Sequence, residues 1–164
     1  MSAFPKIHDT PMQSTITWHC LPFAQLSTTQ LYAILQVRCD VFIVEQNCPY
    51  PDIDGKDPQC THLFAMDEEQ QVAAYLRIVP PGLKYPEVSI GRVLSSPNAR
   101  GTGIGKQLLA KGLEFIAATY SGQPILIQAQ CYLEKFYQSF GFVTVSDVLL
   151  EDDIPHVMML KAAS

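Results

Sequence analysis

The sequence contains no apolar run close to the roughly 20 residues that a transmembrane helix needs. Its first 14 residues also lack the apolar core of a signal peptide. Charged residues make up only 16% of the chain, and the net charge is -5. Binding to nucleic acids or anionic membranes needs basic surface, so neither partner is expected. We therefore expect a cytoplasmic protein with no membrane or nucleic-acid partner.

Cysteines are few, and their pattern excludes the common cysteine frameworks. There are five, an odd number, and no two are spaced C-x-x-C. A disulfide scaffold or a zinc finger is therefore not expected. Cys48, Cys60 and His62 come nearest to a metal-ligand set, but their spacing does not match that of structural zinc sites. We predict no metal and reduced thiols, which fits the cytoplasm.

The length and patterning fit one globular domain. The chain has 164 residues, 48% of them apolar, which is enough for one sizeable core. Residues 1–14 hold two prolines and several small polar residues, so we predict a flexible N-terminal tail there. We assign residues 15–164 to a single domain.

The hydrophobic periodicity predicts mixed secondary structure. Ser27 is a predicted N-cap for a helix that runs to Arg38, and two further helices are expected at 103–120 and 133–140. A long loop rich in Pro, Asp and Gly is expected at 47–58. Strands are expected at 16–20, 62–66, 71–79, 88–95, 124–128, 142–148 and 156–160. This order predicts an α+β fold with a mostly antiparallel sheet rather than a doubly wound one.

The most informative segment lies between the strand at 88–95 and the helix at 103–120. It reads Arg-Gly-Thr-Gly-Ile-Gly-Lys over residues 100–106. Its glycines allow a tight turn and close backbone approach to a ligand, and a helix N-terminus attracts anions. The segment therefore predicts a phosphate-binding loop.

The spacing excludes two familiar nucleotide motifs. A Walker A loop needs four residues between its glycines and a Ser or Thr after its lysine, whereas Gln107 follows Lys106 here. A dinucleotide fingerprint needs glycine at 106, and it normally follows the first strand of its domain.

Two segments instead resemble the GNAT superfamily of acetyl-CoA-dependent N-acetyltransferases. Residues 93–105 match its [RQ]-x-x-G-x-[GA] loop three residues after a strand-ending proline. Residues 136–142, Phe-Tyr-Gln-Ser-Phe-Gly-Phe, resemble its tyrosine-bearing helix that enters a Gly-Phe strand. Residues 38–46, 48–57, 129–130 and 150–156 further resemble the ElaA-like branch. The resemblance covers about residues 18–160 and implies a three-layer α/β/α fold with a mixed, mostly antiparallel central sheet.

The resemblance also implies acetyl transfer from acetyl-CoA to an amine by direct attack in a ternary complex. Tyr137 matches the position that protonates the departing thiolate, and Glu45 and His62 are the first candidates for the base because both flank the expected cleft. A pairing of Glu45 with Arg38 is an alternative. The implied acetyl-CoA-binding residues are Val93, Leu94, Ser95, Arg100, Gly101, Thr102, Gly103, Ile104, Gly105 and Lys106.

Several residues keep two interpretations. The acidic residues Asp52, Asp54, Asp57, Glu151, Asp152 and Asp153 either surround the mouth for a cationic amine or belong to solvated loops. His156 is expected to hydrogen-bond a carboxylate beside them, and Arg92 to be structural or to face the substrate.

Two other functions remain open. An acyl-homoserine-lactone-synthase-like acyltransferase shares the fold, and a CoA-binding regulatory module would bind without turnover. The acceptor is expected to be a small-molecule or peptide amine, and a homodimer is the first assembly to consider.

Overall fold

The structure, a computed structural model, describes residues 15–164. The predicted flexible tail at 1–14 lies outside the described residues. The helices are α1 (Thr28–Arg38), α2 (Ile104–Thr119) and α3 (Glu134–Gln138), and a π-helical segment, η2 (Cys39–Glu45), continues α1. The strands are β1 (Thr17–Pro22), β2 (Thr61–Met66), β3 (Val72–Val79), β4 (Ser89–Ser95), β5 (Ile125–Gln130), β6 (Val143–Thr144), β7 (Leu149–Glu151) and β8 (Ile154–Lys161).

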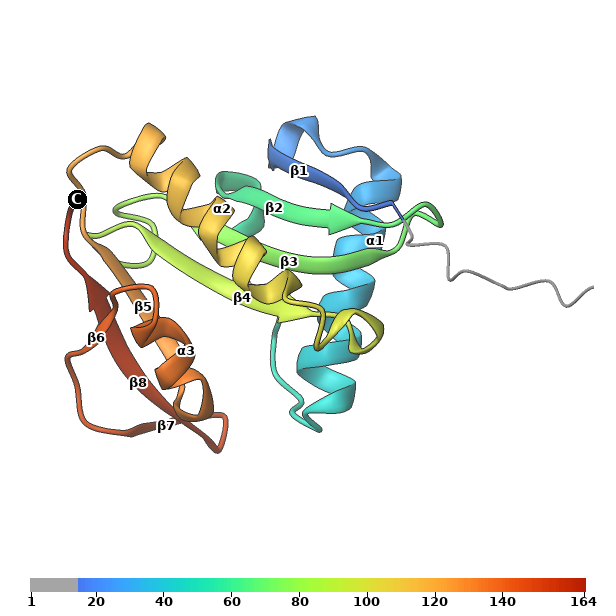
Figure 1. The fold of residues 1–164 in the computed structure, drawn as a ribbon. Coiled ribbons are helices and arrows are strands. Elements are labelled where there is room, and N and C mark those ends of the chain that lie inside the picture. The colour runs from blue at the N-terminus through green and yellow to red at the C-terminus, as the bar shows by residue number, and fades with distance from the viewer. Residues whose placement is uncertain (1–14) are drawn as a thin grey trace, which may run out of the picture.

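The strands form two antiparallel sheets that meet at one end. The first has the order β1-β2-β3-β4, and the second has the order β5-β8-β6, with β7 also pairing with β8. Only one parallel bridge, Val88 to Ile125, joins β4 to β5 within residues 15–164. Figure 1 shows the two halves spreading apart beyond this junction.

Helices cover both faces of the first sheet, as the alternation of β2 requires. Leu63 and Ala65 pack with α2 in one core cluster, whereas Phe64 and Met66 pack with α1 and η2 in the other. All eight residues of β3 are buried, because both of its faces are covered. Figure 1 shows α2 in front of this sheet and α1 behind it, which confirms the predicted α/β/α layers.

Local sequence signals account for the helix that leads to the site. The Ser27 side chain accepts a hydrogen bond from the Gln30 N–H, and the Gln30 side chain accepts one from the Ser27 N–H, which forms a capping box. The predicted N-cap is therefore confirmed. The helix then widens into η2, and single π-helical turns are frequent at functional sites.

The C-terminal segment differs from the prediction in one respect. The strand expected at 142–148 contains only β6 and then leaves the sheet before β7. Asp152 and Asp153, both with positive φ (49° and 62°), form the two-residue turn between β7 and β8. Such turns favour positive φ at both residues, and aspartate tolerates it. Asp152 and Asp153 thus form a tight hairpin turn.

Candidate active site at the divergence of two strands

A cavity of about 610 Å³ lies where β4 and β5 separate. Its walls come from η2, the 47–58 loop, β4, β5, the α3 segment and the β7–β8 turn. Five of the predicted acetyl-CoA residues line it, namely Val93, Leu94, Ser95, Arg100 and Gly105. Tyr137 and Glu45 line it as well, whereas His62 does not.

A bulge in β4 shapes the floor of this cavity. Tyr75 pairs with Leu94 and Arg77 pairs with Gly91, so Arg92 and Val93 together lie opposite the single residue Leu76. Arg92 has a φ of 55°, which is rare for a residue with a Cβ. Bulges recur beside active sites because they redirect strand groups. Beyond Val88 no described strand pairs with the outer edge of β4, so backbone N–H and C=O groups there face the cavity.

The glycine-rich loop leads directly from the end of β4 into α2. Gly101 and Gly103 have φ values of 78° and 83°, and a Cβ added at either would meet no atom within 4 Å. Gly103 is the N-cap of α2 and offers no side chain to its first N–H groups. Those N–H groups and the positive helix end therefore remain free for an anion. A Cβ at Gly105 would lie 3.4 Å from the Ser95 hydroxyl, so this glycine keeps the loop close to β4.

Arg100 and Glu45 form an ion pair across the cavity mouth. Arg100 Nη1 and Nη2 donate to the two Glu45 carboxylate oxygens at 2.8 and 3.0 Å, and Nε donates to the Ser95 carbonyl at 3.2 Å. The alternative pairing of Glu45 with Arg38 is therefore wrong, because Arg38 pairs with Asp52 and Asp57. This ion pair holds the Glu45 carboxylate beside the start of the glycine-rich loop.

Tyr137 is one of three tyrosines that line the cavity, together with Tyr50 and Tyr132. It lies in α3, is 5% exposed, and packs edge-on against Phe136 and Phe142. Burial raises the pKa of its hydroxyl, so the phenol stays protonated at neutral pH. No side chain within residues 15–164 hydrogen-bonds this hydroxyl. Its proton is therefore available to a group bound in the cavity.

His62 lies elsewhere, and the expectation that it flanks the cleft is wrong. It is fully buried in β2, with Nδ1 2.8 Å from the Tyr75 hydroxyl and Nε2 3.0 Å from the Asp57 carbonyl. Burial lowers its pKa, which keeps the ring neutral. Because both ring nitrogens already have protein partners, His62 is not placed to take a proton from a substrate.

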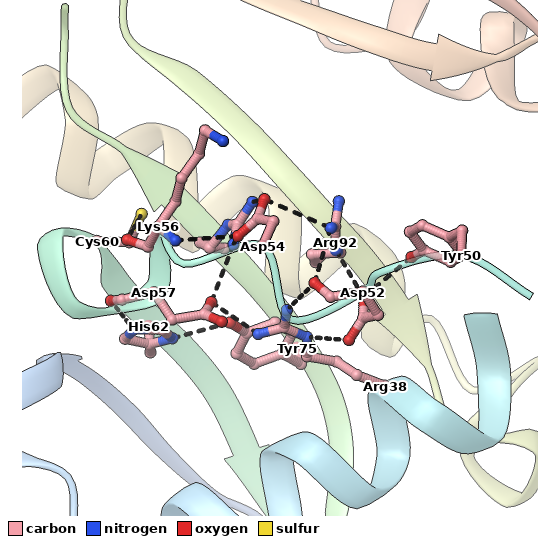
Figure 2. A network of polar contacts seen from close by, with 11 residues as sticks. Arg38, Tyr50, Asp52, Asp54, Lys56, Asp57, Cys60, His62, Tyr75 and Arg92 are labelled. Atoms are coloured by element: carbon pink, nitrogen blue, oxygen red, sulfur yellow. Dashed lines mark hydrogen bonds and ion pairs between the residues drawn. The ribbon is translucent and has the colours of Figure 1, made fainter. Parts of the chain in front are cut away.

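Beneath the cavity lies a buried ion-pair network formed by three arginines and three aspartates. Figure 2 shows how these contacts join the 47–58 loop to the neighbouring strands and to α1. Asp57 accepts from Arg38 at 2.7 Å and from Arg77 at 3.0 Å. Its members are Arg38, Arg77, Arg92, Asp52, Asp54 and Asp57. The three aspartates are therefore neither part of a solvated loop nor free to surround an acceptor mouth.

The network fixes the 47–58 loop against the β4 bulge. Arg92 Nε donates to the Asp52 carboxylate at 2.7 Å, and Nη2 donates to the Asp52 carbonyl at 2.9 Å. The guanidinium also lies over the Tyr50 ring, 5.5 Å from its centroid. Arg92 is thus largely structural, and its ion pairs with the loop hold the strained backbone that forms the cavity floor.

The pKa values in the network follow from this arrangement. Burial acts to raise the pKa of Asp57, but the hydrogen bonds and charges of Arg38 and Arg77 outweigh it, so the pKa lies below its ordinary value. The pKa of Asp54 is lowered in the same way by Arg77, against the effect of burial. Both carboxylates are therefore ionised at neutral pH and balance the buried guanidinium charges.

Residues from both faces of the β5–β8 sheet line the cavity. Ala129 and Val157 point into the core cluster that contains α2 and Tyr137. By strand alternation their neighbours Gln128, Gln130 and His156 point to the opposite face, and all three line the cavity. Lys84, Glu151 and Asp152 line the cavity too. The cavity thus has one side toward the α2 N-terminus and another toward the β7–β8 turn.

Sequence reasoning did not identify His156 as part of the cavity wall toward the β7–β8 turn. Its Nδ1 lies 2.7 Å from the Ile154 carbonyl, not beside a carboxylate as expected. Cys48 connects the same turn to the 47–58 loop through a contact of 3.7 Å with the Asp152 carbonyl. Strand alternation at 154–161 is the signal that could have placed His156 on the face opposite to that of Val157.

Neither a membrane span nor a metal cluster is found in the described part of the chain. None of its helices has the length and apolarity needed to cross a bilayer. Between residues 15 and 164, no three His, Cys, Asp or Glu side chains are grouped so that they could hold a metal ion.

Comparisons of the sequence and of the structure with known proteins identify the same kind of relatives. The acetyltransferase (GNAT) domain family matches residues 37–163. Protein ElaA of Escherichia coli is 45% identical over 148 residues, which cover 89% of this chain and 96% of that protein. The crystal structure of E. coli ElaA superposes with a TM-score of 0.84 at 43% identity, covering 90% of this chain and 99% of that one.

Two further solved structures extend the comparison. An acyl-CoA N-acyltransferase from Pseudomonas aeruginosa has a TM-score of 0.86 at 43% identity, covering 90% of this chain and all of that one. The CoA-dependent acyl-homoserine lactone synthase BjaI has a TM-score of 0.74 at 16% identity, covering 92% of this chain and 84% of that one, a likeness of fold alone.

Proposed function

The chain belongs to the GNAT acetyltransferase family and is an acyltransferase, and from this premise we propose that it moves an acetyl group from acetyl-CoA to an amine by direct attack. The observation that carries the proposal is the unpaired edge of β4 leading into an uncapped helix N-terminus. These two features suit the two ends of one elongated ligand, an amide-bearing arm and a pyrophosphate.

Two parts of the chain are suited to hold two parts of acetyl-CoA. The N–H groups of the loop from Arg100 to Gly105 and the start of α2 would hold the pyrophosphate, with Lys106 adding exposed positive charge. The outer edge of Val93, Leu94 and Ser95 would pair with the pantetheine amides as an added strand. A free N–H next to the Arg92 bulge would polarise the acetyl carbonyl. When bound, acetyl-CoA supplies the thioester carbon that the amine attacks.

Tyr137 is the proposed general acid. Its buried, protonated hydroxyl opens into the cavity among aromatic side chains, where it can give its proton to the departing thiolate. Glu45 remains a lesser candidate for the base because Arg100 already holds both of its oxygens. We instead expect Glu45 to position Arg100.

The residues that line the cavity do not favour covalent catalysis by a cysteine. Cys48 lines the cavity, but burial and the nearby Asp152 and Asp153 raise the pKa of its thiol. A protonated thiol is a poor nucleophile. All five cysteines are free, in keeping with the cytoplasmic location that we expect.

The experiment that tests this function measures thiol release from acetyl-CoA in the presence of an amine panel. The panel holds L-amino acids, spermidine and a lysine-containing peptide, and mass spectrometry identifies the acetylated product. Amine-dependent release supports the proposal. Acetyl-CoA binding without release for any amine would support a regulatory CoA-binding module instead, and preference for long acyl-CoA donors would support the synthase-like alternative.

A further inference from the structure

The side of the cavity toward the β7–β8 turn contains one imidazole that the proposed function does not use. His156 is half-buried, lies on β8 opposite Gln130, and lines the cavity. The strand alternation that directs Val157 into the core directs His156 away from it. His156 therefore faces the part of the cavity that the glycine-rich loop does not reach.

The hydrogen bond of His156 determines which of its nitrogens can accept a proton. Nδ1 lies 2.7 Å from the Ile154 carbonyl oxygen. A carbonyl oxygen can only accept, so Nδ1 must carry the proton of the neutral ring. Nε2 then holds the lone pair, and no group within residues 15–164 hydrogen-bonds it. The Ile154 carbonyl thus fixes the tautomer and leaves Nε2 as the basic nitrogen of a residue that lines the cavity.

We propose that His156 Nε2 is the general base that takes a proton from the acceptor amine, and that the amine enters from the side of the β7–β8 turn. This inference rests on the proposed acetyl transfer. Tyr137 belongs to the core cluster on the other face of the β5–β8 sheet, so the acid and the base approach the cleft from opposite faces. The group that takes a proton from the amine is therefore separate from the group that gives a proton to the thiolate.

The protons balance as follows. Nε2 removes one proton from the ammonium group, and the resulting amine forms a C–N bond to the acetyl carbon as the C–S bond breaks. Tyr137 gives its hydroxyl proton to the departing sulfur, and the second proton of the attacking nitrogen restores the phenol. His156 then releases its proton to water. The products are an N-acetyl amine, CoA thiol and one proton.

Several other groups on the cavity wall are less suited to this role. Glu45 is paired with Arg100, and Arg92 with Asp52. The charged groups that line the cavity are Glu45, Lys84, Arg92, Arg100, Glu151 and Asp152. They come from η2, the loop before β4, β4, the glycine-rich loop after it, the end of β7 and the β7–β8 turn. Its uncharged titratable groups besides His156 are Cys48, Tyr50, Tyr132 and Tyr137. Burial raises the pKa of both Cys48 and Tyr50, which makes them proton donors rather than bases at neutral pH.

The test uses His156→Asn in the full chain. An asparagine amide can still donate to the Ile154 carbonyl, so the turn keeps its hydrogen bond while the basic nitrogen is lost. The matched control is His19→Gln, which removes a histidine of β1 that stacks on Phe64 and does not line the cavity. Rates of thiol release are measured from acid to alkaline pH with each amine of the panel, and acetyl-CoA affinity is measured by calorimetry.

For His156→Asn we expect kcat/KM to fall by about 10²-fold or more, as for other lost general bases. We also expect the decline of kcat/KM toward acid pH to disappear in this variant, while its acetyl-CoA affinity stays unchanged. In a second variant, His156→Gly, added imidazole should restore part of the rate. A variant that keeps the wild-type pH profile, or whose loss is matched by His19→Gln, would overturn the role of His156. Wild-type protein that binds acetyl-CoA but releases no thiol would overturn the proposed function itself.

Nitrogen NMR gives a readout that does not depend on turnover. We expect the neutral His156 ring to carry its proton on Nδ1, with Nε2 unprotonated and responsive to added amine in the presence of CoA. A ring protonated on Nε2 would contradict the proposal, whatever the kinetics show.

Discussion

Replacing Asp57 by asparagine should destabilise the protein more than breaking any exposed ion pair. The Asp57 carboxylate is 7% exposed and accepts from both Arg38 and Arg77, whose side chains are 0% and 2% exposed. Removing one partner of a buried pair costs roughly 3–5 kcal/mol, because the other charge stays buried without compensation. Arg38 keeps Asp52 and Arg77 keeps Asp54, so we expect the lower end, about 3 kcal/mol.

The assay is thermal unfolding at neutral pH, with Glu45→Gln as the matched control. In a domain of this size each kcal/mol moves Tm by roughly 2–4 °C, so Asp57→Asn should lower it by about 6–12 °C. The Glu45–Arg100 pair is 41% and 45% exposed, and such pairs contribute about 0–1 kcal/mol. Equal Tm values for the two variants would refute the idea that the buried network holds the 47–58 loop.

The pH dependence of the same effect has a definite sign. The pKa of Asp57 is lower in the folded protein than in the unfolded chain, so its stabilising contribution is complete above the unfolded value of about 3.9 and is lost as pH falls below it. The Tm difference between wild type and Asp57→Asn should therefore be full at neutral pH and shrink under strongly acidic conditions. A difference that grows on acidification would contradict the assigned ion pairs.

Three further predictions concern the proposed site. Tyr137→Phe should lower kcat by about 10²-fold with acetyl-CoA affinity unchanged, and an unaltered kcat in a pre-steady-state assay would remove Tyr137 from the mechanism. Arg100→Gln should weaken acetyl-CoA binding by roughly 10- to 100-fold in calorimetry, since it loses a charge-assisted bond of about 1.5–3 kcal/mol, and equal affinity would exclude a phosphate contact. Gly103→Ala and Gly122→Ala, at φ values of 83° and 76°, should each cost about 1–2 kcal/mol of stability. Only Gly103→Ala should also weaken acetyl-CoA binding, and equal effects of the two would assign the loop a purely structural role.

Local patterns in the sequence predicted most of the fold. The Ser27 capping box, the apolar face of α2 and the alternation along β2 each depend on residues close together in the chain. The glycine-rich loop was placed correctly for the same reason, because it joins one strand to the next helix.

The features that sequence reasoning missed depend on contacts between distant residues. Asp52 pairs with Arg38 and Arg92, which are 14 and 40 positions away in the sequence. Because neither arginine is close in the chain, the sequence around Asp52 looks like a solvated acidic loop. The bulge at Arg92 requires the register of β3 against β4, which no local pattern specifies. The same holds for the pair of Glu45 and Arg100, which lie 55 positions apart.

The measurement that tests the account most directly is thermal unfolding with acetyl-CoA, beside CoA, ATP and NAD. Ligand at about 100 times Kd adds roughly 2.7 kcal/mol to the folded state. For a domain of this size that predicts a rise in Tm of about 5–10 °C with acetyl-CoA and with CoA, and none with ATP or NAD. An unchanged Tm at millimolar acetyl-CoA, or an equal rise with all four ligands, would contradict the claim that this cleft binds acetyl-CoA.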